Sequence, residues 1–379
     1  MIRFAHLLLV AGGLIAKGLA SATDAPATTQ SQTEALAPAE NIRPYQARTD
    51  RSRPLIAVVG ENSGTELTDF VIPYAVLSRS GVADVLSVAT LPGILKLRPA
   101  VQVQPQATTA GFDELHPDGA DYVIVPAVNK ADDAVLLAWI TAQAAKGATI
   151  VSICDGALVV ANTGLMRGRR ATGHWATHEL RKQSYPDTHW ETNTRYVADG
   201  AIVSSAGISA SIPTAFALVE AIAGRDRAVA LAKEMGVSDW GPQHNSDAFH
   251  FGLRSYAMYG AAIVNGWFHK TESVGIPVSP GVDEIALALT ADVYSRTYRG
   301  VRAYTVASSN EPIQTLGGLT LVPDRLLGGD GAPDRMLPPL DSTPSMLVLD
   351  KVLARVSSDY GASAAASAAY DLEYPRAKQ

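Results

Sequence analysis

Residues 148–165 read ATIVSICDGALVVANTGL, and in them a strand runs directly into a helix. The β-branched run before Cys154 predicts a buried strand, and ALVVANTGL predicts a helix that ends at Gly164. Cys154 is the only cysteine of the chain and lies at the turn between the two. A thiol at a helix N-terminus faces unpaired backbone N–H groups and the positive end of the helix dipole. This placement predicts a nucleophile elbow with cysteine as the nucleophile.

The residues after the cysteine bear on its chemistry. Gly156 allows a tight turn and a close approach of a substrate to the backbone. The amides of Asp155 and Gly156 are expected to hold a developing oxyanion. A carboxylate beside the thiol, that of Asp155, is expected to raise the pKa of the thiol and to weaken the nucleophile. The alternative is that Cys154 is a small buried apolar residue, as a lone cysteine in an apolar strand often is.

Apolar strands alternate with helical segments on both sides of this stretch. LIAVVG from Leu55, VADVLSVAT from Val82 and DYVIVPAV from Asp121 read as buried strands. Such alternation predicts an α/β fold, a parallel sheet covered by helices on both faces. Open sheets of this kind bind ligands at the carboxyl ends of their strands, where the elbow lies.

A second stretch repeats part of this plan. GVDEIALALTADVYSRTYRGVRAYTVASS (281–309) follows the pattern of ELTDFVIPYAVLSRSGVADVLSVAT (66–90), and Ser78-Arg79 aligns with Ser295-Arg296. We therefore expect a degenerate half copy of the first domain in the C-terminal part. The copy contains no cysteine, so it cannot carry the same nucleophile. A half sheet would leave an exposed edge and an uncovered apolar face, so we expect it to dock on the first domain.

The composition describes a folded protein with an unusual N-terminus. The chain has 379 residues, 47% hydrophobic and 18% charged, with a net charge of −6, which argues against nucleic acid as a partner. Arg3, the apolar run HLLLVAGGLIA and the small residues Ala20-Ser21-Ala22 predict a secretory signal peptide. We therefore expect a periplasmic or secreted protein, with an uncleaved N-terminal anchor as the alternative.

These features divide the chain into five parts. We expect a signal peptide at 1–22, a disordered linker at 23–53, an α/β domain at 54–236, a helical connector at 237–273 and the half-repeat domain at 274–379.

The strand–Cys–x–Gly-Ala–helix pattern resembles the ThiJ/PfpI superfamily, which has a class I glutamine-amidotransferase-like, flavodoxin-type sandwich fold. The resemblance is closest to the branch with isonitrile hydratase and the N-terminal ligand domains of AraC-type regulators. Its matching segments are TELTDFVIPYAVLSRSG, DYVIVPAV, SICDGALVVANTGLMRGRRATGHW and AGISASIPTAFALVEAIAG, within about 54–225.

The resemblance implies roles for individual residues. Cys154 corresponds to the family nucleophile, Asp69 to the helix acid that hydrogen-bonds it, and His174 to a histidine that some members place near the cysteine. In the repeat, Ala286 stands at the position of Asp69. The substrate pocket implied by the resemblance is lined by Ala127 and Val128, where the family usually has two glycines, and by Gly207, Ile208 and Ser209.

The expected function is that of an exported, cofactor-independent cysteine protein that acts on a small electrophilic substrate, in the manner of an isonitrile hydratase. The alternative is a ligand-binding or redox-sensing module without turnover. His174 and His178 could present a metal site on one helical face, but a clear third ligand is missing, so no metal is expected. We expect no stable membrane insertion after signal cleavage, and either a homodimer or an intramolecular mimic of a dimer.

Overall fold

The computed structural model describes residues 40–252, 271–297 and 300–374. The predicted signal peptide and about half of the predicted connector, residues 253–270, lie outside these residues. The strands are β1 Leu55–Gly60, β2 Thr65–Glu66, β3 Asp84–Ala89, β4 Leu95–Arg98, β5 Gln102–Gln104, β6 Ala107–Thr108, β7 Tyr122–Val125, β8 Thr149–Ser152, β9 Arg170–Ala171, β10 His189–Trp190, β11 Tyr196–Asp199, β12 Ile202–Ser205, β13 Ser273–Pro277, β14 Arg302–Ala307, β15 Ile313–Gln314, β16 Thr320–Val322, β17 Arg325–Leu326 and β18 Arg335–Met336.

The α-helices are α1 Leu67–Ser80, α2 Thr109–Leu115, α3 Ala134–Ala145, α4 Gly156–Asn162, α5 His178–Ser184, α6 Ser211–Ala223, α7 Arg225–Met235, α9 Glu284–Ser295, α10 Val348–Tyr360 and α11 Ala362–Asp371. None of the helices within the described ranges is long and apolar enough to cross a membrane.

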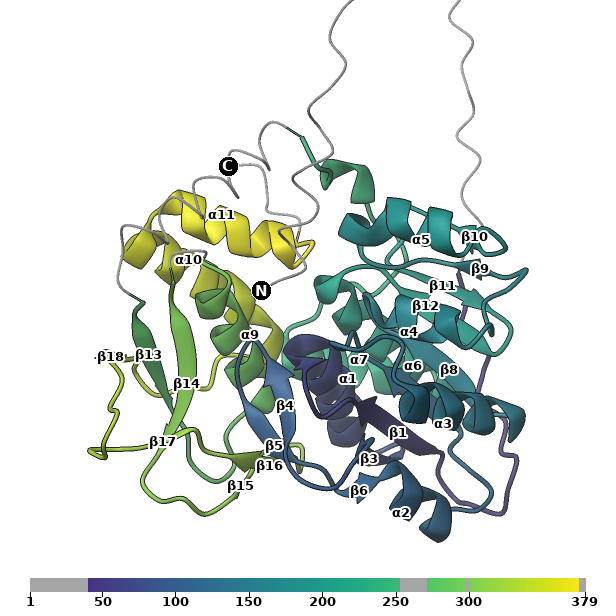
Figure 1. Ribbon diagram of the computed structural model, residues 1–379, viewed down its shortest axis with the longest axis horizontal. Helices are drawn as coiled ribbons and strands as arrows, with labels where there is room; N and C mark the ends of the chain where they lie inside the picture. The colour runs from purple at the N-terminus through teal and green to yellow at the C-terminus, as the bar shows by residue number, and fades with distance from the viewer. Residues whose placement is uncertain (1–39, 253–270, 298–299, 375–379) are drawn as a thin grey trace, which may run out of the picture. The chain divides into compact units, whose positions relative to one another are not determined.

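A seven-stranded sheet in the order β11-β12-β8-β7-β1-β3-β6 forms the centre of the first domain (Figure 1). All neighbours are parallel except β11 and β12, which form an antiparallel hairpin at one edge. Buried apolar side chains of α2, α3 and α4 form one core cluster, and those of α1, α6 and α7 belong to another. The predicted α/β fold with a parallel sheet covered on both faces is therefore confirmed.

The C-terminal elements, which we call the C-terminal subdomain (residues 271–374), build a smaller parallel sheet in the order β17-β14-β13-β18. The pairings of β13, β14 and β17 follow those of β1, β3 and β6 at a constant offset along the chain. Val88 pairs with Ala107 in the first sheet, and Val306 pairs with Arg325 in the second. Ile56 of β1 pairs with Tyr122, and β18 takes the corresponding place beside Val274 of β13. The strand pairing is consistent with a half copy that extends beyond the stretch whose sequence suggests it.

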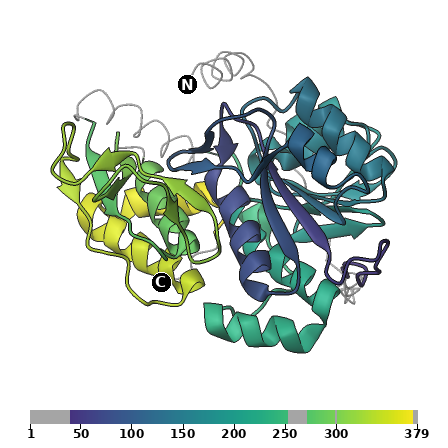
Figure 2. The ribbon, with the colours of Figure 1, turned by 90° about the horizontal axis from the view of Figure 1, so that it is seen from below.

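Helices α1 and α9, which correspond in the two copies, pack against each other (Figure 2). Arg79 of α1 contacts the N-cap of α9, Asp283, at 3.1 Å. Arg296, the C-cap of α9, contacts the N-cap of α1, Glu66, at 2.9 Å. The same contact is thus made twice in opposite directions, as across the two-fold axis of a symmetric dimer.

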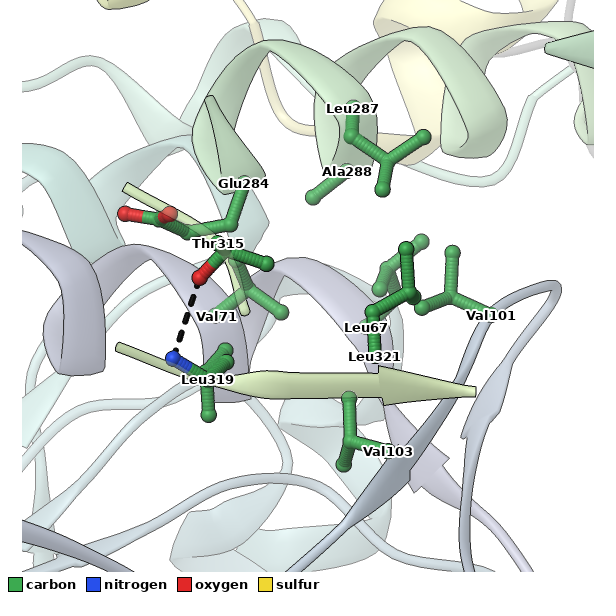
Figure 3. Close-up of a pocket in the computed structure, with 10 residues that line it drawn as sticks. All are labelled: Leu67, Val71, Val101, Val103, Glu284, Leu287, Ala288, Thr315, Leu319 and Leu321. Carbon is green, nitrogen blue, oxygen red and sulfur yellow. Dashed lines mark hydrogen bonds between the residues drawn. The ribbon is translucent and has the colours of Figure 1, made fainter. Parts of the chain in front are cut away.

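Strands β5 and β16 continue this symmetry. The two strands pair antiparallel, with Val103 opposite Leu321, in a five-stranded sheet to which both parts of the chain contribute. Matching side chains from the two copies line a cavity of about 10 Å³ at this junction, too small for more than about one water molecule (Figure 3). The lining residues are Leu67, Val71, Val101, Val103, Glu284, Leu287, Ala288, Thr315, Leu319 and Leu321.

Residues 40–53 correct one expectation, since the linker prediction covered them. Ile42 is 8% exposed and belongs to the large core cluster, and Tyr45 donates its backbone N–H to Ala221 O at 2.8 Å. Glu40 pairs with Arg170. Arg48 and Arg51 pair with Asp121, and Arg53 pairs with Asp84. One buried isoleucine among polar and charged residues is a weak signal in the sequence, so the composition alone suggested disorder.

Candidate active site

Cys154 lies between β8 and α4, in the elbow that the sequence predicts. Its φ of 57° is left-handed, a conformation that residues other than glycine rarely adopt. The Cys154 backbone N–H donates to Ser205 Oγ at 3.3 Å, and the residue is 4% exposed. Backbone conformations of this kind persist where the surrounding structure holds them, and they cluster at functional sites.

Gly156 begins α4 and is the residue that permits the turn. A Cβ at this position would lie 1.9 Å from the Val125 carbonyl oxygen, so no other residue fits without moving the backbone. The Gly156 N–H donates to Ile153 O at 2.8 Å and closes the turn itself. This amide, one of the two expected to hold an oxyanion, is therefore already engaged.

Asp69 supplies a buried acid from the first turn of α1. Its Oδ2 accepts a hydrogen bond from the Ala127 backbone at 3.2 Å, whereas its Oδ1 has no partner among the described residues. Burial raises the pKa of Asp69 well above its usual range, and the negative charge of Glu66 raises it further. Asp69 therefore keeps its proton to higher pH than an ordinary aspartate and has one oxygen free to share it.

The thiol lies in a largely anionic environment. Burial is the main cause that raises the pKa of Cys154 well above its usual value, followed by the charges of Asp69, Asp155 and Glu66. A hydrogen bond from the Asp155 backbone acts in the opposite direction. The Asp155 amide thus favours the thiolate, but formation of the thiolate also needs a nearby base or cation.

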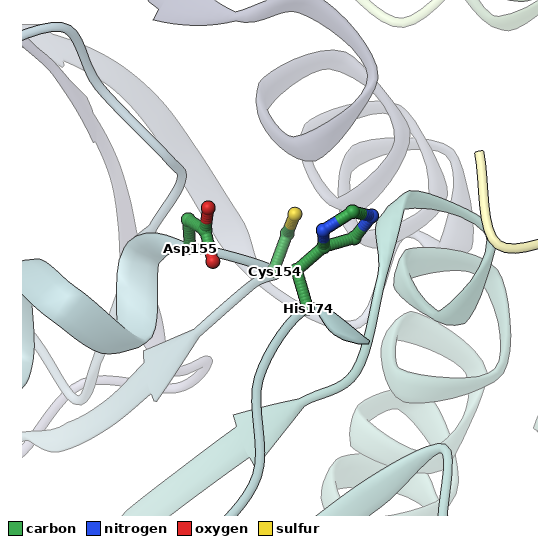
Figure 4. Close-up of side chains that lie close together, drawn as sticks. All are labelled: Cys154, Asp155 and His174. Atoms are coloured by element: carbon green, nitrogen blue, oxygen red, sulfur yellow. The ribbon is translucent and has the colours of Figure 1, made fainter. Parts of the chain in front are cut away.

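Cys154, Asp155 and His174 come together at this point, and their sulfur, oxygen and nitrogen atoms lie within 4.8 Å of one another (Figure 4). The Asp155 carboxylate accepts from Thr177 Oγ1 at 2.5 Å and lies 3.7 Å from the Arg181 guanidinium. A guanidinium so close to the carboxylate would repel a metal cation. We therefore interpret the three residues as an acid–base group and identify no metal ligands among them.

His174 stands beside the sulfur, as Figure 4 shows. Its Nε2 lies 3.2 Å from Asp371 O, a carbonyl that can only accept, so Nε2 carries the proton. Its Nδ1 accepts a long hydrogen bond of 3.4 Å from the Ala176 backbone. Nδ1 has a single lone pair, so His174 acts as a base toward Cys154 only when the thiol displaces this long contact.

The predicted pocket residues fall into two groups. Ala127 and Val128 lie beside the N-terminus of α1, where the Ala127 N–H is used by Asp69 and Val128 forms an isolated β-bridge with Thr65. Gly207, Ile208 and Ser209 lie under the C-terminal segment. Ser209 donates its N–H to Leu372 O at 2.9 Å and its hydroxyl to Glu373 O at 2.7 Å.

Three charged residues of the site were missed in the sequence. Arg181 is 1% exposed and donates to the His174 carbonyl at 2.7 Å, although it lies in a basic stretch of the sequence. Glu66 accepts from the Asp69 N–H at 2.6 Å, and a glutamate just before a helix was a signal that could have revealed this N-cap. Glu373 reaches the site from the C-terminal subdomain, and nothing in its local sequence points there.

Asp155→Ser is expected to lower the pKa of the Cys154 thiol and to speed its alkylation at neutral pH by about tenfold, because one negative charge leaves the vicinity of the sulfur. The measurement is the alkylation rate against pH. Asp187→Ser, an exposed aspartate on a loop, is the matched control and should leave the profile unchanged. An Asp155→Ser profile that is unchanged or moved to higher pH would show that the carboxylate supports the thiolate instead.

Residues 56–221 match the DJ-1/PfpI family. An isonitrile hydratase from Pseudomonas putida is 36% identical over 99 residues, which are 26% of this chain and 41% of that protein. The HTH-type transcriptional regulator CdhR from Pseudomonas aeruginosa is 30% identical over 127 residues, 34% of this chain and 36% of the regulator. The chain thus spans less than half the length of either relative. The crystal structure of Drosophila melanogaster DJ-1beta aligns with a TM-score of 0.44 and 22% identity, over 49% of this chain and 100% of that one.

Proposed function

Residues 56–221 form a domain of the DJ-1/PfpI family, and on this premise we propose that the protein is a cofactor-independent hydratase that uses Cys154 as its nucleophile. The observation that carries the proposal is the elbow itself. A cysteine with left-handed φ has the Asp155 amide directed at its sulfur and shares its surroundings with Asp69 and His174. These are the parts that covalent catalysis needs, namely a nucleophile, a base, an acid and an oxyanion donor.

An isonitrile is the substrate class that we favour, since the P. putida relative is named for it. In the first step the sulfur attacks the terminal carbon of the isonitrile. The thiol proton moves to His174, and Asp69 gives its proton to the same carbon, so a neutral thioimidate forms. Water then adds to that carbon, returning one proton to Asp69, while His174 protonates the nitrogen. Collapse of this adduct breaks the carbon–sulfur bond, releases the N-substituted formamide and restores the thiol.

The same residues would also support hydration of an α-oxoaldehyde, because its aldehyde carbon is likewise electrophilic. A ligand-binding or redox-sensing role without turnover is the second candidate. Two observations favour it, the 4% exposure of Cys154 and the similarity to a transcriptional regulator. Both observations are consistent with a small ligand held beside a thiol that reacts slowly.

Turnover separates the two candidates. Purified protein is expected to convert members of a panel of isonitriles and α-oxoaldehydes, and Cys154→Ala should lower kcat/KM by at least about 10³-fold because the covalent step is lost. The loss should come without a comparable change in thermal stability, which circular dichroism would check. Saturable binding without turnover in the wild-type protein would establish the ligand-binding role instead.

Reactivity of the thiol is a separate prediction. Cys154 should be alkylated in the native protein, with a rate that continues to rise above the pH at which an ordinary cysteine has reached its plateau. The reason is that burial and neighbouring carboxylates raise its pKa. Alkylation quenched at successive times and analysed by mass spectrometry measures this rate. A thiol that is modified only after unfolding would favour the buried apolar role of Cys154.

A further inference from the structure

The end of α11 lies against the loops that carry the site. The backbone carbonyl of Asp371 accepts a hydrogen bond from His174 Nε2. The backbone carbonyls of Leu372 and Glu373 accept hydrogen bonds from the N–H and the hydroxyl of Ser209. The C-terminal subdomain therefore contributes directly to the surroundings of the cysteine, although it has no nucleophile of its own.

Glu373 has an unusual conformation for its position. It follows α11 with a φ of 53°, a left-handed value, and it is 1% exposed. Gly236, which follows the end of helix α7, also adopts a left-handed φ, of 79°, but has no side chain. Glycine is the usual residue at such a helix end. A buried glutamate with a left-handed φ there has an unfavourable conformational free energy, which other contacts must offset.

The Glu373 carboxylate has its contacts inside the site. His244 Nε2 lies 2.9 Å from Oε1, and the Trp175 backbone N–H lies 3.5 Å from Oε2. The Ser246 side chain also bonds the carboxylate. Gly207 leaves the space for it, because a Cβ there would lie 2.2 Å from Glu373 Oε2.

The charge of Glu373 is linked to that of His174. Burial tends to raise the pKa of Glu373, but the bond from His244 and the charge of His174 bring it below its usual value. Glu373 is therefore ionised at neutral pH and stabilises positive charge on the imidazole of His174. Its charge is not among the principal causes that raise the pKa of Cys154, so its direct effect on the sulfur is small.

We propose that Glu373 is a positioning residue for the cysteine site, supplied by the C-terminal subdomain, which stabilises the protonated form of His174 when Cys154 loses its proton. The inference rests on the proposed function, since it assigns His174 as the base for that thiol. The charged and titratable groups around the pair are Asp69, Asp155, Glu66, Arg181, His244 and the thiol itself.

The test is Glu373→Gln, which keeps the size of the side chain and removes its charge. We expect Cys154 alkylation at neutral pH to slow by about tenfold and its pH profile to move upward, because the imidazolium loses a counter-charge. The measurement is the alkylation rate against pH, followed by mass spectrometry. Glu179→Gln on α5, whose side chain is 72% exposed, is the control and should leave the profile unchanged.

An unchanged alkylation profile in a folded Glu373→Gln protein whose wild-type form reacts would overturn the inference alone. A purely structural role for Glu373 would lower the melting temperature and leave the alkylation profile in place. If Cys154 of the wild-type protein does not react at all, the proposed function fails and the inference fails with it.

Discussion

Gly156→Ala is expected to lower the free energy of unfolding by about 3 kcal/mol or more and to abolish native Cys154 reactivity. The added methyl group would lie 1.9 Å from the Val125 carbonyl oxygen, and backbone atoms on both sides of the contact have little freedom to move. Relief of the clash must therefore separate β7 from the turn that holds Cys154. Urea unfolding monitored by circular dichroism measures the first effect, and alkylation the second.

Gly111→Ala provides the matched control. Gly111 lies in α2, and the nearest atom to an added Cβ is Thr108 Oγ1 at 3.4 Å, an ordinary contact. Because alanine favours the helix, the free energy of unfolding should stay within about 0.5 kcal/mol of the wild-type value or rise slightly. A Gly156→Ala protein with the wild-type midpoint and a reactive thiol would show that the elbow is looser than the structure indicates.

Local patterns in the sequence were sufficient to predict the elbow and the parallel sheet. The run before Cys154 is β-branched, the residues after it favour a helix, and the spacing between them leaves room only for a turn. Periodicity and turn chemistry act over a few residues, so they can be read without the fold. The repeat could also be recognised from local sequence, because two helical segments share a Ser-Arg pair.

Contacts between distant parts of the chain could not be predicted in this way. Glu373 occupies space that only a glycine at position 207 leaves open, and neither residue stands out in its local sequence. Arg181 lies in a basic stretch that is typical of a solvated surface, yet the fold buries it beside Asp155. Helices α6 and α10 illustrate a further limit. Each precedes a glycine with positive φ, at Gly224 and Gly361, but their sequences share little else that would mark them as copies.

The role of the C-terminal subdomain was predicted only in part. Docking of a half copy follows from the need to cover an apolar face, and the structure shows α9 packed on α1. The sequence indicated that the copy carries no nucleophile, but it did not indicate that the copy places charged groups near the site. Arg296 bonds Glu66, and Glu373 accepts from the Trp175 backbone beside His174. The copy lacks the nucleophile but supplies charges around it.

Deleting residues 274–379 is expected to have the other large effect, namely aggregation or dimerisation of the remaining protein. The buried face of α1 packs on α9, and both belong to one continuous core cluster. The deletion would expose this face and leave β5 without its partner β16, so an apolar surface and a free strand edge would be presented together. Sedimentation velocity and binding of a hydrophobic dye would detect both.

A point substitution tests the same interface in the full-length chain. Leu287→Asp places a carboxylate at a site that is 2% exposed, against α1, and should cost about 3–5 kcal/mol of unfolding free energy. Leu316→Asp, at a position that is 55% exposed in the same subdomain, should cost less than about 0.5 kcal/mol.

A truncated protein that stays monomeric and equally stable would mean that the C-terminal subdomain is an independent module. In that case the reciprocal contacts of Arg79 and Arg296 would add nothing to stability. If instead the truncated protein dimerises, the surface that α9 covers is one through which two copies of the first domain can associate.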